Sequence, residues 1–139
     1  LKTSGKTGLH VHIPLSTGYT YDQSRMFCEG IARVVARDLP EIATVERVIG
    51  NRDGKVYVDF GQNRRQQTIV PPYVVRPVRG ATVSAPLAWD ELTPTLTPQA
   101  FTILTVPPRL AERGDLFAPL LDDPQDLLPA IEKLQSLFT

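Results

Sequence analysis

The sequence has little cysteine and no long apolar run. Its 139 residues include one cysteine, Cys28, which excludes an internal disulfide or a thiolate-rich zinc site and fits a reducing cytoplasm. No run approaches the roughly 18 apolar residues of a membrane span, and no signal-peptide pattern opens the sequence. We therefore expect a cytoplasmic protein that has no membrane among its partners.

Net charge is also absent, because 15 Lys or Arg balance 15 Asp or Glu. The charges are unevenly distributed along the chain. Residues 1–80 carry twelve basic and seven acidic residues, whereas residues 81–139 carry three and eight. A basic half of the chain is able to face phosphate groups. Solvated faces of unequal sign explain the same counts, so both interpretations stay open.

Hydrophobic spacing predicts three helices. The first covers about 21–38, with Thr20 or Asp22 as its cap, and the second is a short turn near 108–113. The last begins after Asp123 and Pro124, a cap followed by proline at the first helical position. Its expected buried stripe consists of Leu127, Leu128, Ile131, Leu134 and Phe138.

Alternating and β-branched segments predict the strands. Two arms, 43–49 and 55–60, flank an Asn-Arg-Asp-Gly turn and suggest a β-hairpin. Prolines between 68 and 88 favour short or edge strands there. Further strands are expected at 8–15 and 100–106. Together the elements predict one α+β domain over residues 1–139, with helices packed on a largely antiparallel sheet.

Residues 4–8, Ser-Gly-Lys-Thr-Gly, end like the phosphate-binding loop of ATPases. That loop needs a helix after its Gly-Lys-Thr, but the following Leu-His-Val-His-Ile-Pro-Leu has the period of a strand. We therefore exclude the ATPase loop. The turn still offers free backbone N–H groups, two hydroxyls and the ammonium of Lys6, which together suit an anion. A plain surface turn is the alternative.

The alternation in 8–15 predicts two faces. Leu9, Val11 and Ile13 would point to the core, and His10 and His12 away from it. By the same alternation Asp59 lies on the non-core face of its own strand.

If the strands of His10 and Asp59 share a sheet, an imidazole and a carboxylate project from one side of it. An aspartate that binds Mg²⁺ or Mn²⁺, beside cations on a polyphosphate, is an arrangement for nucleotidyl transfer. Arg76 is the first candidate for such a cation, and Arg64, Arg65 and Arg79 could add to it. A solvent-facing histidine and an ordinary aspartate at a strand end remain the alternatives.

Four stretches, KTSGKTGLHVHIPL, VYVDFGQN, TIVPPYVVRP and GATVSAPLAWDEL, occur in one order along the chain. Together they resemble the polymerase/primase domain of bacterial ligase D, the end-joining member of the archaeo-eukaryotic primase superfamily. The resemblance extends from residue 1 to about residue 138. It implies a catalytic sheet like that of an RNA-recognition motif.

The resemblance also implies roles for individual residues. Ser4 and His10 match the serine and histidine that contact the triphosphate of the incoming nucleotide in this family. Arg76 matches a further phosphate contact, and Lys6 would be a supporting cation. The position of His12 is often aromatic in such proteins, so we treat His12 as secondary.

Asp59 matches the third metal-binding aspartate of the family, and Gln62 and Asn63 follow it in the same motif. The Asp-x-Asp pair that supplies the other two carboxylates precedes this stretch in the family and is missing here. We therefore expect the C-terminal portion of a primase/polymerase domain, inactive by itself; a degenerate relative is the alternative.

The function implied is a metal-dependent nucleotidyltransferase that adds ribo- or deoxyribonucleotides to DNA ends in non-homologous end joining. Its cofactor would be Mn²⁺ or Mg²⁺, and its location the nucleoid of a bacterial cytoplasm. DNA ends and nucleoside triphosphates would be its partners, together with Ku and a fused or separate ligase. A non-catalytic module that holds a nucleotide or a DNA end, or a structural fragment, remains the alternative.

Overall fold

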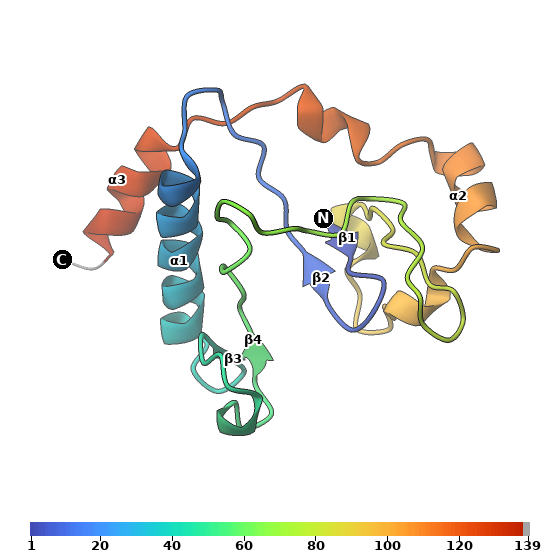
Figure 1. Cartoon of the computed structure of the whole chain (residues 1–139), viewed down its shortest axis with the longest axis horizontal. Coiled ribbons are helices and arrows are strands. Elements are labelled where there is room, and N and C mark those ends of the chain that lie inside the picture. The colour runs from blue at the N-terminus through green and yellow to red at the C-terminus, as the bar shows by residue number, and fades with distance from the viewer. Residues whose placement is uncertain (138–139) are drawn as a thin grey trace. The chain divides into compact units, whose positions relative to one another are not determined.

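The computed structural model describes residues 1–137, in which the chain forms two compact units (Figure 1). The first unit consists of residues 1–14 and 70–125. The second consists of residues 15–69 and the stretch that begins at residue 126. Helices and short strands both occur, so the predicted α+β class is confirmed. One domain over residues 1–139 stays a prediction.

Short pairings around a buried segment organise the first unit. Strand β1 (Lys2–Thr3) pairs antiparallel with β2 (Leu9–His10), which places Lys2 opposite His10. Residues 82–87 are all buried and bridge to β1 and to neighbouring loops, in agreement with the short strands expected in this proline-containing region. The core of the unit is Val83, Ala85, Leu87, Phe101 and Val106.

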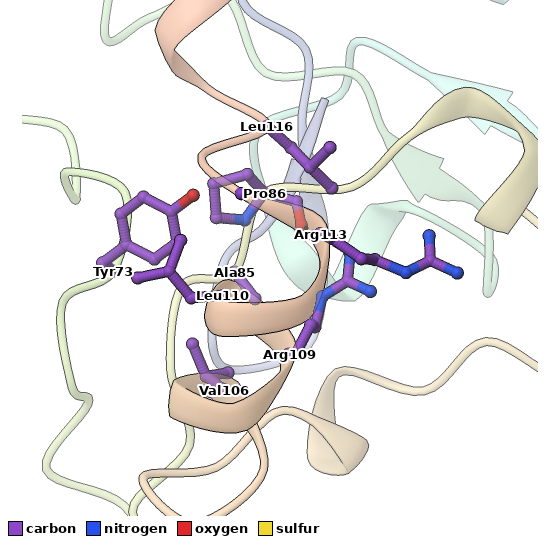
Figure 2. Close-up of a pocket in the computed structure, with 9 residues that line it drawn as sticks. Tyr73, Ala85, Pro86, Val106, Arg109, Leu110, Arg113 and Leu116 are labelled. Atoms are coloured by element: carbon purple, nitrogen blue, oxygen red, sulfur yellow. Dashed lines mark hydrogen bonds between the residues drawn. The ribbon is translucent and has the colours of Figure 1, made fainter.

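Helix α2 (Val106–Arg113) covers this core (Figure 2). Arg109 extends from it and donates to both carboxylate oxygens of Glu91 at 2.6 Å, and to the carbonyl oxygen of Pro86 at 3.1 Å. Tyr73 packs against the core, and its hydroxyl donates to Asp115 Oδ1 at 2.6 Å.

The predicted strand at 100–106 is wrong. Phe101 is buried and Thr102 bridges to Thr82, but the chain then turns into α2. Thr102 and Thr105 cause the turn, because the hydroxyl of each accepts the backbone N–H of the other. Hydroxyl side chains that bond the local backbone compete with strand pairing in this way. The helical turn expected near 108–113 is confirmed.

The second unit is built on α1 (Tyr21–Asp38), whose predicted bounds and cap are confirmed. The Thr20 hydroxyl accepts the N–H of Gln23, and the Gln23 side chain accepts the N–H of Thr20. Helix α3 (Leu128–Ser136) packs beside α1 (Figure 1).

Helix α3 departs from its prediction in its start and its stripe. Its N-cap is Leu127, whose side chain makes no capping hydrogen bond, so the predicted cap Asp123 is wrong; the N–H of Leu128 bonds Asp126 Oδ1 at 3.0 Å. Leu127 is buried as expected, but Leu128 is 60% exposed and so does not belong to the buried stripe. Phe138, the last member of the predicted stripe, lies outside the described residues.

The predicted hairpin of 43–49 and 55–60 is also wrong. The expected turn is present, and Asp53 and Gly54 both have positive φ. However, β3 (Ala43–Thr44) and β4 (Val56–Tyr57) pair in parallel. The reason lies in the intervening loop, where residues 49–51 form a 3₁₀ helix and the Arg52 guanidinium donates to two backbone carbonyls, those of residues 46 and 47.

Four short 3₁₀ helices complete the described elements: Ile49–Asn51, Trp89–Glu91, Pro98–Ala100 and Ala118–Leu121. No helix within residues 1–137 has both the length and the apolar character needed to cross a membrane.

The Glu91–Arg109 pair allows a test of the first unit. Arg109→Lys should lower the free energy of unfolding by about 1–2 kcal/mol, because an ammonium cannot replace a bidentate guanidinium. Arg113→Lys is the matched control, since Arg113 is more exposed and reaches the same carboxylate only at 3.4 Å. Its effect should stay below about 0.5 kcal/mol. Urea unfolding measures both, and equal losses would contradict the assignment.

Candidate functional site

The turn of residues 4–8 is closed by its own serine. The backbone N–H of Ser4 donates to the carbonyl oxygen of Gly8 at 2.7 Å. Ser4 Oγ accepts the N–H of Lys6 at 3.1 Å and that of Gly8 at 3.0 Å. The sequence had suggested that the N–H groups of this turn are free, but these two are engaged by Ser4. Because Ser4 Oγ accepts both of these hydrogen bonds, its own O–H is the group it has left to donate.

Gly5 allows the turn to lie against Arg76. It has φ +69° and is buried, and a Cβ at this position would lie 2.5 Å from Arg76 Cγ and 3.0 Å from the backbone nitrogen of Ser84. The carbonyl oxygen of Gly5 accepts the Thr82 hydroxyl, and the carbonyl oxygen of Thr82 accepts the N–H of Arg76 at 2.7 Å. Only glycine therefore fits both the backbone angle and the space.

Lys2 is a residue that the sequence reasoning missed. It is fully buried, and its Nζ lies 2.6 Å from Ser84 Oγ and 2.9 Å from His10 Nδ1. Burial, and then the charge of Arg76, lower the pKa of Lys2 to about 8. A signal did exist in the sequence: a tight turn at 4–8 before a strand requires residues 1–3 to pair with that strand, and so places Lys2 opposite His10.

The predicted faces of the 8–15 segment are reversed. Leu9, Val11 and Ile13 are 40%, 63% and 41% exposed, whereas His10 and His12 are partly buried. The cause is the set of partners on the histidine side. Lys2 bonds His10, and the His12 ring meets the ring of Phe117 edge-on at 5.2 Å. Regular strand structure is confined to Leu9–His10.

His12 behaves as a packing residue. Its Nε2 is buried and has no hydrogen-bond partner among residues 1–137. Burial, followed by the charges of Lys2 and His10, lowers the pKa of His12 to about 4, so the ring is neutral at pH 7. This agrees with its secondary rank in the sequence analysis.

Lys2 and Arg76 form a cationic cluster without an acidic partner. Within the described residues, neither makes an ion pair with a carboxylate, and Arg76 Nε is buried without a hydrogen-bond partner. Lys6 and Arg79 are exposed in the same unit, and the exposed Arg64 and Arg65 belong to the second unit. The first unit thus places His10 against Lys2, and Arg76 against the turn that begins at Ser4.

Asp59 lies in the second unit, two residues after β4, and is exposed. Its Oδ1 accepts the N–H of Gly61 at 2.8 Å, and the Asn63 side chain donates to the carbonyl oxygen of Phe60 at 3.3 Å. Gln62 is exposed. The strands of His10 and Asp59 belong to different two-stranded sheets, because β2 pairs with β1 and β4 with β3. The condition set in the sequence analysis, that these two strands share a sheet, is therefore not met among residues 1–137.

The metal expected from the sequence needs several oxygen ligands. Over residues 1–137, no three His, Cys, Asp or Glu side chains gather in a way that could hold an ion. One exposed carboxylate, that of Asp59, does not fit a Mg²⁺ or Mn²⁺ site by itself.

Residues 1–117 match the family model described as the LigD primase-polymerase domain. The chain belongs to this family. Among its relatives is the bifunctional non-homologous end joining protein LigD of Bacillus subtilis (strain 168), 41% identical over 126 residues. That alignment covers 90% of this chain and 21% of the relative. The multifunctional LigD protein of Mycolicibacterium smegmatis is 35% identical over 85% of the chain and 15% of its own length.

A solved structure resembles this member of the LigD family in fold. It is the polymerase domain from Mycobacterium tuberculosis ligase D in complex with DNA, with a TM-score of 0.81 and 32% identity. The match covers 89% of this chain and 43% of that domain. The chain thus spans less than half of the solved domain and about a fifth of the Bacillus protein.

The close approach of Gly5 to Arg76 generates a prediction. Gly5→Ala should destabilise the chain by about 2 kcal/mol or more, through the positive φ and the short Cβ contacts. Gly8→Ala is the control, because a Cβ at Gly8 would meet nothing within 4 Å. It should change the free energy of unfolding by less than about 0.5 kcal/mol. Thermal unfolding compares the two, and a stable Gly5→Ala variant would refute the packing argument.

His12 generates a prediction about pH. The pKa of His12 falls from 6.5 to about 4 on folding, so between these values the unfolded chain binds more protons, and stability is lost as the pH falls. His12→Phe removes this loss, and at pH 7 should stabilise the chain by about 1 kcal/mol by removing an unpaired buried nitrogen.

The stability advantage of His12→Phe should therefore widen as the pH falls from 6.5 towards 4. Urea unfolding across this range measures it. Val11→Ala, a change at an exposed neighbour, should show no such trend. An advantage that is constant with pH would contradict the neutral, buried state of His12.

Proposed function

We propose that this chain supplies the nucleotide-binding part of a primase-type polymerase that extends DNA ends during non-homologous end joining. One observation carries the proposal. Lys2 is fully buried and Arg76 is partly buried close to it, and neither forms an ion pair with any carboxylate among residues 1–137. A buried cation is costly unless an opposite charge compensates it. An anionic ligand is the compensation that a binding site would use.

The donors around this cluster favour a polyphosphate over a single small anion. The Ser4 hydroxyl lies on the turn of residues 4–8, the His10 imidazole on strand β2, and the Arg76 guanidinium on the second segment of the first unit. Such separate donors suit several phosphate oxygens, each bound by a charge-assisted or hydroxyl hydrogen bond. Lys6, exposed on the turn, would add positive potential without a fixed contact. The triphosphate of an incoming ribo- or deoxyribonucleotide fits this description.

Donors fixed in advance also explain how the unit would contribute to catalysis. Phosphoryl transfer depends mainly on positioning and electrostatic stabilisation, and no covalent protein intermediate is required. Ser4 and Gly5 hold the turn, and Arg76 lies directly against it. We infer that these residues orient the two outer phosphates of the nucleotide.

The DNA end, Ku and a ligase are proposed as partners on the strength of family membership. Relatives are named as non-homologous end joining proteins, and the similar polymerase domain was solved in complex with DNA. A template-primer end is the substrate that would accept the nucleotide.

Asp59 is proposed as one ligand of Mn²⁺ or Mg²⁺, with Gln62 and Asn63 supporting its loop. When bound, the metal would supply Lewis-acid stabilisation of phosphate charge. Its other ligands would be carboxylates from outside residues 1–137, since no metal-binding group of three is found within them. The chain's own residues would bind the nucleotide without it.

Primer extension tests this proposal in the full-length protein that carries the chain. Asp59→Asn should reduce Mn²⁺-dependent extension at least about 100-fold, because a metal contributes several kcal/mol to the transition state. Asp53→Asn is the control, since Asp53 is exposed in a turn of the same unit and asparagine tolerates its positive φ. Undiminished extension by Asp59→Asn would overturn the metal assignment. ATP binding without any extension by the unaltered protein would instead support the non-catalytic module.

A further inference from the structure

Lys2 and His10 are paired directly across the β1–β2 hairpin. The two residues are register partners, and the Nζ of Lys2 lies 2.9 Å from Nδ1 of His10. The second partner of Lys2 is Ser84 Oγ at 2.6 Å. Ser84 in turn donates its hydrogen to the carbonyl oxygen of Thr3 at 2.8 Å, so it is an acceptor toward Lys2. The ammonium is therefore held between two acceptors in a fully buried position.

The direction of the Lys2–His10 bond follows from chemistry. A protonated lysine has three donors and no acceptor, so the nitrogen opposite it must accept. The pKa of Lys2, lowered to about 8 by burial and by Arg76, still lies above 7, so the protonated form predominates at neutral pH. Nδ1 of His10 then carries no proton, and the ring hydrogen lies on Nε2.

We infer that Lys2 is a positioning residue, which fixes His10 in the Nε2–H tautomer so that the imidazole donates to a phosphate oxygen. This rests on the proposed nucleotide-binding function of the same site. A histidine in the other tautomer would present a lone pair to the phosphate, and two acceptors repel each other. Lys2 thus acts through His10 and is not itself required to touch the nucleotide.

The arrangement also explains why the cation at residue 2 is buried while Lys6 is exposed. Lys6 lies on the open side of the turn, where its charge is screened by water. Lys2 has two fixed partners, His10 and Ser84. Ser84 is itself anchored to strand β1, because its hydroxyl donates to the carbonyl oxygen of Thr3. An ammonium that is buried and held by two hydrogen bonds fixes the orientation of a neighbouring imidazole ring, whereas an exposed and flexible ammonium does not.

The test measures the tautomer and the binding of ATP in the full-length protein. The ring nitrogens of His10 are observed by ¹⁵N NMR after histidine labelling, and their signals are assigned by their loss in His10→Gln. The unaltered protein at pH 7 should show a protonated Nε2 and an unprotonated Nδ1. Lys2→Met should produce a mixture of tautomers, while Lys6→Met, which removes a charge from the same turn, should leave the tautomer unchanged.

ATP, titrated with Mg²⁺ present, provides the second readout. Lys2→Met should weaken ATP binding about tenfold or more, as expected for a lost hydrogen bond to a charged group. Lys6→Met should weaken it only about twofold. In the His10→Gln background, Lys2→Met should lose most of its effect, because the residue acts through the ring.

Each failure has a distinct meaning. A protonated Nδ1 in the unaltered protein overturns the inference, even if Lys2→Met does not fold. An unchanged tautomer in a folded Lys2→Met variant, or an undiminished effect of Lys2→Met in the His10→Gln background, also overturns it and leaves the nucleotide-binding proposal standing. Absence of ATP binding by the unaltered protein, with the tautomer as expected, overturns the proposed function and with it the phosphate contact of His10.

Discussion

The first unit depends on the buried ammonium of Lys2, which pairs with no carboxylate among residues 1–137. Lys2 lies under the turn of residues 4–8, bonded to Ser84 and His10, with the guanidinium of Arg76 nearby. Burial of these cations opposes folding, and hydrogen bonds to Ser84 and His10 offset part of that cost for Lys2. The neighbouring Thr3 illustrates this, because its hydroxyl donates to Val83 and accepts from Ala85. The polar network and the apolar core are thus interleaved along the same residues, 82–87.

The turn of residues 4–8 is ordered by one side chain and one glycine, without a helix. Ser4 collects the N–H groups of Lys6 and Gly8, and these two bonds polarise its remaining O–H. Gly5 lets Arg76 approach the backbone of the turn. Ser4 Oγ therefore accepts two backbone N–H groups of the turn, and the Ser4 hydroxyl is left as a donor in their place. This is a different solution from a helix N-terminus, where the backbone groups face the ligand directly.

Structure that depends on neighbouring residues in the chain, such as helix α1 and its cap, was predicted correctly from the sequence. The cap at Thr20 and the period of 21–38 define α1, because both depend on neighbours within four residues. Ser4, His10 and Arg76 were singled out through their motifs, and their role at a site stays a prediction. Which side of the 8–15 segment is buried was not predictable, since Phe117 and Lys2 decide it from elsewhere in the chain.

The same distinction explains the other errors. An Asp-Gly turn is a strong hairpin signal, yet Arg52 bonds the backbone of its own loop and directs β4 parallel to β3. The alternation of 100–106 was outweighed by two threonines that bond each other's backbone. In both regions a side chain competes with strand pairing, and periodicity does not report such competition.

The partners of β1 carry a consequence for the order of folding. Thr3 and Lys2 bond Val83, Ser84 and Ala85, about eighty positions further along the chain. Closing so long a loop costs entropy that only the complete network returns. Helix α1 needs no such distant partner and is able to form while the chain is still emerging from the ribosome. Residues 1–3, although synthesised early, therefore stay solvated until residues 82–87 are available to enclose them.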